Sequence, residues 1–230
     1  MVLNSFSLGT RDDIVIFEVM LDSYSTQNFQ MPLQHISLVE AYDYLESRKD
    51  RSRVFAAVLD LRINLILVFS DITSMGAVWN RLFSKGRLEG GSVLDNAIKF
   101  NGKMDIHRFN TSFVLRYRAL WDKLMGLMIL MDAPQHYDKF IKANSRKKEF
   151  IKIAKAQKIC EEAFIVQLVD LLTTFDNKFR TSEAHGTGVL RKYSFLMEPM
   201  IDNPQGDLVE YWNRLNQFIA NYGKVFKKKR

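Results

Sequence analysis

The sequence predicts an all-α protein, and three observations support this prediction. The 230 residues include only four prolines and eleven glycines, the residues that most often interrupt helices. Apolar side chains recur at steps of three and four residues over several long stretches, which is the spacing of one helix face. The alternating pattern of half-buried strands is weak throughout. We therefore expect an up-and-down helical bundle with extra N-terminal and connecting elements.

The chain begins with a short element, Ile14 to Tyr24, and a polar connector that ends at Pro32. We treat residues 1–33 as an N-terminal extension for this reason. Ser37 is a suitable N-cap for the helix that follows, because its hydroxyl can accept a hydrogen bond from a free backbone N–H. That helix would place three residues on one face: Leu38, Tyr42 and Leu45.

A long buried helix is predicted from Val54 to about Ser84 by six apolar residues at helical spacing, namely Val54, Val58, Leu61, Leu65, Phe69 and Ile72. The glycines between Gly86 and Gly102 then predict a loop or a small irregular insertion. The wider connector, residues 86–109, has no interpretation beyond that.

Three further helical regions are predicted in the second half of the chain. The first runs from about Thr111 to Met131, and Ala133–Pro134 ends it. The basic segment 135–157 is typical of one or two helices with too few apolar residues to be fully buried. The third region runs from about Ile159 to Lys178.

A break follows from Arg180 to Gly188, and Val189 to Met197 can resume as a helix. Asp207 is a suitable cap for a final helix whose apolar residues are Val209, Trp212, Leu215 and Ile219. We expect one helical domain over residues 34–226 and a basic tail over residues 227–230.

Composition limits where the protein works. Its one cysteine, Cys160, cannot form an internal disulfide, which favours a reducing compartment. The start of the chain has no secretory signal pattern, and no apolar stretch is long enough to span a bilayer. The sequence therefore predicts a cytoplasmic protein that does not associate with membranes.

The net charge of +7 is concentrated in two places. Residues 139–158 hold eight Lys or Arg and one acid, and residues 224–230 hold five Lys or Arg and no acid, so the remaining chain has a net charge of −5. Each basic segment can be a solvated surface or can bind a polyanion, and the sequence does not decide between these uses.

Standard catalytic and metal-binding motifs are missing from the sequence, which has no phosphate loop, no His-Glu-x-x-His pair and no cysteine pair. We therefore expect no metal and no cofactor. Three arginines interrupt otherwise apolar helix faces, and we expect each to extend to solvent rather than to line a cleft: Arg62, Arg116 and Arg118.

The densest chemistry lies between Phe179 and Lys192, which reads Phe-Arg-Thr-Ser-Glu-Ala-His-Gly-Thr-Gly-Val-Leu-Arg-Lys. A histidine exchanges protons near neutral pH and arginines keep their charge, so this group is suited to handling a phosphate. In a regular helix Arg180 and His185 would diverge by about 140°. Gly186 and Gly188 indicate that the helix breaks here, which would allow the two to converge.

This Arg-x-x-x-x-His motif at the boundary of the last core helices resembles the HEPN superfamily, and the run behind it is similar to a clostridial branch of that superfamily. The resemblance implies a helical bundle that dimerises with two motifs facing each other. It implies a metal-independent endoribonuclease, in some members a toxin or defence effector with an antitoxin partner. His185 would transfer the proton and Arg180 would stabilise charge, while the 2′-hydroxyl of the RNA attacks the phosphate.

Substrate contacts are expected from the residues around this motif. Arg191 and Lys192 follow His185 at distances suited to a flanking phosphate, if the chain there is helical. Thr181 takes the place of the Asn, Asp or His that active members commonly carry after the arginine, and it can donate a hydrogen bond but cannot share charge.

Two alternatives stay open. The same dimer could bind a nucleotide, RNA or protein without cutting it. Alternatively, Arg180, Glu183 and His185 could form a purely structural hydrogen-bond network that holds the helix break.

Overall fold

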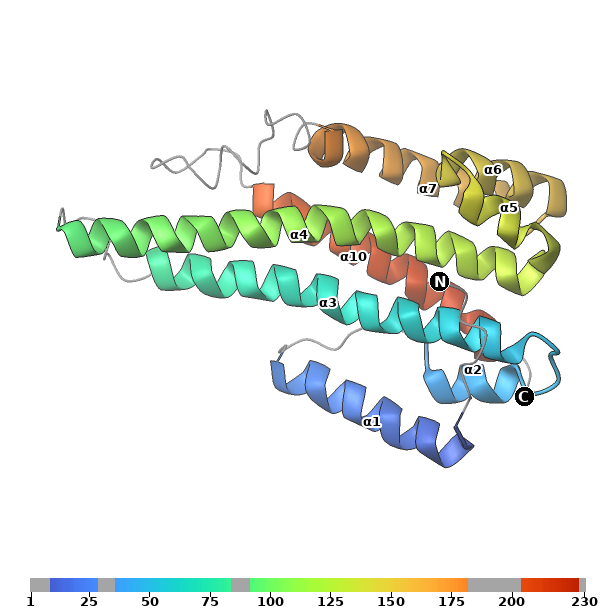
Figure 1. The fold of residues 1–230 in the computed structure, drawn as a ribbon. Coiled ribbons are helices and arrows are strands. Elements are labelled where there is room, and N and C mark those ends of the chain that lie inside the picture. Colours follow the sequence, from blue (N-terminus) through green and yellow to red (C-terminus); the bar gives the residue numbers. More distant parts are fainter. Residues whose placement is uncertain (1–8, 29–35, 84–91, 182–203, 228–230) are drawn as a thin grey trace. The chain divides into compact units, whose positions relative to one another are not determined.

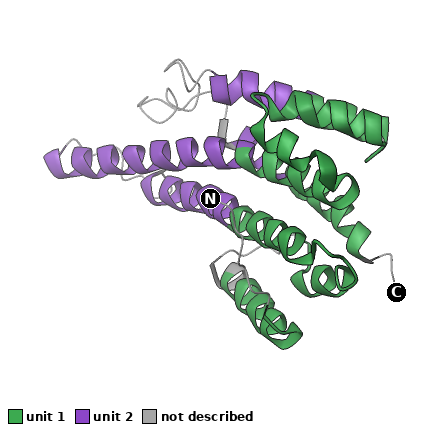
Figure 2. Cartoon of the chain, turned by 45° about the vertical axis from the view of Figure 1, so that its right-hand side comes forward, with its two compact units in different colours: residues 1–66, 119–169, 214–230 green, residues 67–118, 170–213 purple. Residues whose placement is uncertain are grey.

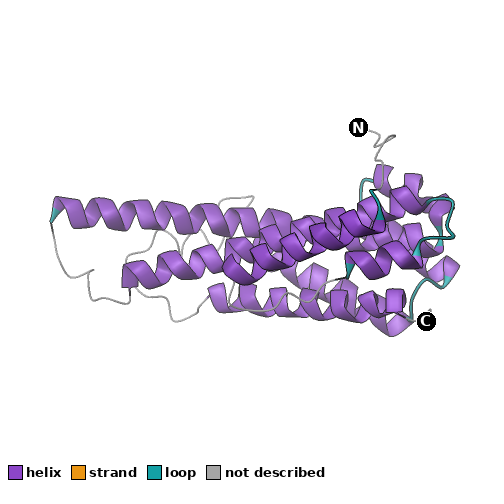
Figure 3. Cartoon of the chain, turned by 90° about the horizontal axis from the view of Figure 1, so that it is seen from below, coloured by secondary structure: helices purple, strands orange, loops and turns teal. Residues whose placement is uncertain are grey.

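The computed structural model describes residues 9–28, 36–83, 92–181 and 204–227 of the chain, and every regular element in these ranges is helical (Figures 1 and 3). The predicted all-α class is confirmed for this part of the chain. The α-helices are α1 (Arg11–Asn28), α2 (Leu38–Tyr44), α3 (Arg51–Phe83), α4 (Val93–Asp132), α5 (Tyr137–Lys142), α6 (Arg146–Gln157), α7 (Glu162–Phe175) and α10 (Pro204–Gly223). The short turns are η1 (Pro134–His136), η2 (Asp176–Arg180) and η3 (Lys224–Lys227).

The chain divides into two compact units (Figure 2). Unit 1 comprises residues 1–66, 119–169 and 214–230, and unit 2 comprises residues 67–118 and 170–213. The divisions fall within α3, α4, α7 and α10. The predicted boundaries at 33/34 and 226/227 do not coincide with these divisions and stay a prediction.

In unit 1, the start of α2 is built as its sequence predicts. The hydroxyl of Ser37 accepts a hydrogen bond from the backbone N–H of Glu40 at 3.2 Å, so Ser37 is the N-cap. Leu38 and Leu45 are fully buried. The ring of Tyr42 packs edge-on against Phe55 of α3, which attaches α2 to the longer helix.

The C-terminal end of α4 is closed by an arginine. The guanidinium of Arg48 donates hydrogen bonds to the carbonyls of Leu130 and Met131 at 3.0 and 2.9 Å. These carbonyls belong to the last turn of the helix, where no later N–H is available to them. Arg48 also makes a two-pronged pair with Asp50, which raises the pKa of Arg48 and lowers that of Asp50.

The predicted solvent exposure of Arg62 is wrong. Arg62 of α3 does not extend to solvent, because it is 3% exposed and pairs with Asp22 and Glu18 of α1. It also donates a hydrogen bond to the carbonyl of Ile36 at 3.2 Å. Burial lowers the pKa of Arg62, and the two carboxylates oppose that effect. A buried cation needs such partners to offset its lost hydration.

The prediction of a loop between Gly86 and Gly102 is wrong for residues 93–102, because α4 begins at Val93 and continues through Gly102. Ser92 caps this start by accepting a hydrogen bond from the N–H of Asp95 at 3.0 Å. A β-carbon at Gly102 would lie 2.4 Å from a methyl carbon of Leu82 on α3. The glycine therefore permits close packing of α3 on α4 in unit 2, rather than breaking the helix.

The basic segment forms two short α-helices, α5 and α6, as predicted. Four of its apolar side chains face inward: Phe140, Phe150, Ile153 and Ala154 are each at most 4% exposed. Lys148, Lys152 and Lys158 are exposed. Ser145 caps α6, and Lys158 ends it with a left-handed φ of 53°. This amphipathic arrangement is typical of a solvated surface.

Candidate functional site

The described part of the predicted motif lies in unit 2, at the point where α7 changes its hydrogen-bonding pattern. Residues Asp176–Arg180 form η2, a π-helical turn, and Thr181 continues in right-handed helical geometry with φ −68° and ψ −47°. Single π-helical turns are rare and occur frequently at functional sites. This turn precedes the predicted break at residues 180–188, which lies outside the described residues beyond Thr181 and stays a prediction.

An aromatic cluster holds this turn in place. Phe179 is fully buried, and its ring lies 5.4 Å from that of Phe175 and 5.7 Å from that of Tyr211 on α10. The ring of Phe175 lies 4.3 Å from that of Tyr117 on α4. The hydroxyl of Tyr117 donates a hydrogen bond to the carbonyl of Tyr211 at 3.0 Å. The residue next to Arg180 is thus fixed on both sides by rings that pack at favourable distances.

Arg180 itself extends outward from this cluster. Its side chain is 53% exposed, and among the described residues it pairs with Asp176, one helical turn earlier, at 3.8 Å. Water solvates the guanidinium but not the oxygen of Asp176 that faces it, because that oxygen is buried. The guanidinium is therefore accessible to a phosphate, which would compete with one weak carboxylate contact.

The carboxylate of Asp176 lies between two arginines. Arg118 on α4 approaches the same oxygen of Asp176 at 3.5 Å, and its side chain is only 11% exposed. The prediction that Arg118 extends to solvent is therefore wrong, because its side chain is largely buried and pairs with Asp176. The sequence contained a signal for the Asp176–Arg180 pair, since Asp and Arg four residues apart meet on a helix face. It contained none for Arg118, because that contact depends on tertiary packing.

Two further cations of unit 2 form ion pairs with carboxylates. Lys178 pairs with Asp207 of α10 at 2.6 Å. The predicted capping role of Asp207 is wrong, because α10 begins at Pro204 and Asp207 lies in its first turn.

Arg116 is half-exposed and pairs with Asp71 of α3 at 3.3 Å. Burial raises the pKa of Asp71, and hydrogen bonds from Ser112 and Arg116 oppose that increase.

The other predicted site residues, His185, Arg191 and Lys192, lie outside the described residues, as do Glu183 and the predicted helix from Val189 to Met197. The structure thus places Arg180 and Thr181 next to each other at the exposed end of η2 and leaves their convergence with His185 a prediction. Within the described ranges, no group of three or more His, Cys, Asp or Glu side chains could hold a metal ion. Nor does any helix there combine the length and apolar content needed to cross a membrane.

The fold and the turn define an all-α protein with an arginine presented at a π-helical turn. Comparison with known proteins adds no relative: no family model, no curated protein and no solved structure matches this chain.

Proposed function

We propose that this protein is a metal-independent endoribonuclease of the HEPN type, in which Arg180 and His185 act on a phosphate of the RNA backbone. The observation that supports the proposal best is the exposed guanidinium of Arg180, held at a π-helical turn by the buried Phe179 beside it. An arginine in this position can approach a phosphodiester, because about half of its side chain faces solvent.

The proposed reaction needs only the RNA and two side chains. The 2′-hydroxyl attacks the adjacent phosphorus, the bond to the 5′-oxygen of the next nucleotide breaks, and a 2′,3′-cyclic phosphate and a 5′-hydroxyl result. His185 transfers the proton, a role that contributes roughly 10²–10⁴-fold. Arg180 stabilises the negative charge that develops on the phosphoryl oxygens. Thr181, Arg191 and Lys192 hold flanking phosphates.

A second candidate is binding of RNA or a nucleotide without cleavage. It is favoured by the contact between Arg180 and Asp176, because a carboxylate beside the arginine weakens its attraction for a transition-state charge. In this case Arg180, Arg191 and Lys192 supply the affinity, and His185 is replaceable.

A comparison of four proteins separates the two candidates: wild type, His185→Ala, His185→Gln and Arg180→Ala. Cleavage of structured RNAs is measured in EDTA, and binding of the same RNAs is measured by filter retention. The ribonuclease proposal predicts that both histidine variants bind RNA like wild type and cleave it at least about 100-fold more slowly. Binding without cleavage by any protein, weakened only in Arg180→Ala, would favour the second candidate. Equal cleavage by wild type and His185→Ala would overturn the catalytic role of His185.

A further inference from the structure

Helix α1 has its apolar side exposed. Of its described side chains, Ile14 and Glu18 are buried, while Ile16, Val19 and Met20 are 61%, 61% and 63% exposed. Tyr24 and Phe17 are 52% and 37% exposed. Residues 16, 19, 20 and 24 lie on one side of a helix, so these side chains form a continuous stripe, which we call the α1 face. An exposed apolar stripe of this kind marks an interaction site.

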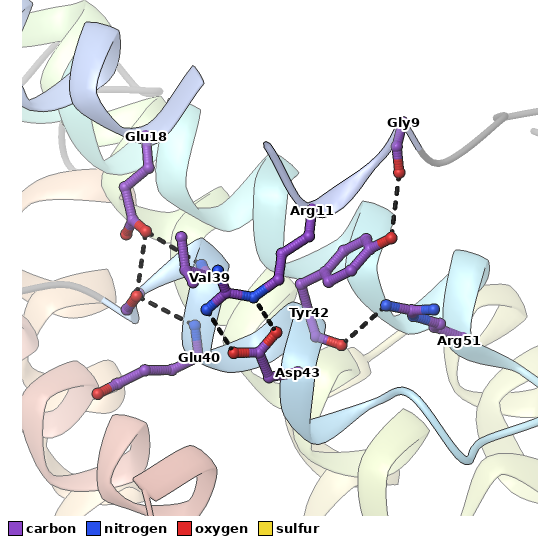
Figure 4. Close-up of polar contacts among 9 residues, drawn as sticks. Gly9, Arg11, Glu18, Val39, Glu40, Tyr42, Asp43 and Arg51 are labelled. Carbon is purple, nitrogen blue, oxygen red and sulfur yellow. Dashed lines mark hydrogen bonds and ion pairs between the residues drawn. The ribbon is translucent and has the colours of Figure 1, made fainter. Parts of the chain in front are cut away.

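Polar contacts join α1 to α2 within unit 1 (Figure 4). The carboxylate of Glu18 accepts hydrogen bonds from the N–H groups of Leu38 and Val39 at 2.8 and 3.0 Å. Arg11 forms two hydrogen bonds with Asp43 of α2 at 2.8 and 2.9 Å. These contacts stabilise the start of α2 and hold α1 against it, and none of them involves Ile16, Val19 or Met20.

The charges of α1 indicate the class of partner. Between Asp13 and Asp22 the only ionisable side chain is the buried Glu18. The helix has no lysine, and its single arginine is paired with Asp43. Helices that lie on membranes carry Lys or Arg beside the apolar face, and nucleic-acid surfaces need cations. An apolar, uncharged face fits a protein interface, and interfaces between identical subunits are the more apolar kind.

The available area and the acidic end of the helix favour a second copy in one orientation. The five exposed side chains form one continuous apolar area, which the same area of a second copy can cover in a self-complementary contact. In a parallel pair, Asp12 and Asp13 of both copies would repel each other. In an antiparallel pair they lie toward the C-terminal end of the partner helix, whose last turn has no charged residue in its sequence.

We propose that the α1 face binds α1 of a second copy of this chain in an antiparallel, two-fold symmetric contact near Met20. This inference is independent of the proposed ribonuclease, because the α1 face belongs to unit 1 and Arg180 belongs to unit 2. It also differs from a dimer formed through the Arg-x-x-x-x-His motif.

Sedimentation of the full chain across the micromolar range tests the contact. We expect wild type to be a dimer, Val19→Asp and Met20→Glu to be monomers with unchanged helical circular dichroism, and Val166→Asp to remain a dimer. Val166 is the matched control because it is 60% exposed on α7 of the same unit. A monomeric wild type, or dimers in both α1 variants, would overturn the proposal. Loss of the dimer in Arg180→Ala with retention in Val19→Asp would assign association to the motif instead.

Cross-linking tests the orientation in a Cys160→Ser background. Met20→Cys should form disulfide-linked dimers on mild oxidation, because two copies of this residue meet at the symmetry axis. Asp12→Cys should not, because its copies lie at opposite ends of an antiparallel pair. Cross-linking of Asp12→Cys, or its absence in Met20→Cys, would contradict the antiparallel arrangement.

Discussion

Two arginines on amphipathic helices differ completely in their surroundings. The side chain of Arg62 is 2% exposed and contacts two carboxylates, whereas that of Arg180 is 53% exposed and contacts one. Sequence spacing could predict the partner of Arg180, which is four residues away. It could not predict the partners of Arg62, because Glu18 and Asp22 lie about 40 residues earlier and reach it only through the packing of α1.

This difference predicts unequal costs of substitution. We expect Arg62→Met to lower the free energy of unfolding by about 3–5 kcal/mol, because Glu18 loses its cation in a buried place. Arg180→Ala should change it by less than about 1 kcal/mol, because its guanidinium is half-exposed and Asp176 keeps Arg118 as a partner. Urea denaturation followed by circular dichroism measures both. Similar costs for the two variants would contradict the burial of Arg62.

Burial also raises the pKa of Cys160 to about 11, with a smaller contribution from Asp132. The thiolate is the reactive form, so we expect Cys160 at pH 8 to react with Ellman's reagent about 100-fold more slowly in the folded protein than in urea. The folded state binds the thiol proton of Cys160 more tightly than the unfolded state, so the protonated thiol contributes to stability at neutral pH. This contribution to stability is lost as the pH rises through 9 to about 11. Equal rates in the two states would show that Cys160 is freely exposed.

At the scale of the elements, glycine was the main source of error in prediction. The predicted helix from Val54 to about Ser84 continues through Gly76, whereas Gly102 is assigned to a loop. The structure distinguishes them: nothing lies within 4 Å of a β-carbon placed at Gly76, whereas one at Gly102 would clash with Leu82. A glycine needed for close packing of two helices has the same local sequence signal as a helix breaker. The boundaries of α3 were predictable because its apolar spacing is regular.

The two glycines provide a matched pair of substitutions in unit 2. Gly76→Ala should raise the free energy of unfolding by about 0.5–1 kcal/mol, because alanine favours the helix and has room. Gly102→Ala should lower it by about 1–3 kcal/mol, because the buried Leu82 must move. Denaturation midpoints of both variants against wild type are the measurement. A stabilising Gly102→Ala would show that α3 and α4 do not approach closely there.

The π-helical turn η2 depends on Phe179, which no sequence pattern assigns to it. We expect Phe179→Ala to lower the free energy of unfolding by about 3–5 kcal/mol, since the fully buried ring contacts Phe175 and Tyr211. Val209→Ala in α10 is the control, because Val209 is 41% exposed in the same unit and should cost less than about 1 kcal/mol. Chemical denaturation measures both. A small effect of Phe179→Ala would mean that the ring does not anchor the turn.

At the scale of the whole molecule, the fold class was predictable and the division into units was not. Helical spacing is local, so the absence of strand patterns and the shortage of proline were sufficient for the all-α prediction. The units are assembled from segments far apart in the chain, such as residues 67–118 with 170–213, and no local signal specifies that association. For the site, Arg180 and Thr181 were recognisable from their motif, whereas Asp176 and Arg118 required the structure.

The most direct test of the proposed function is a cleavage assay on two matched oligonucleotides in EDTA. One is RNA, and the other carries 2′-deoxyribose on the 5′ side of the mapped cleavage position. Attack by the 2′-hydroxyl predicts that wild type cuts only the RNA and leaves a 2′,3′-cyclic phosphate, and that His185→Ala leaves both intact. Cleavage of the deoxy-substituted strand, or no cleavage of any RNA by wild type, would contradict the proposed ribonuclease.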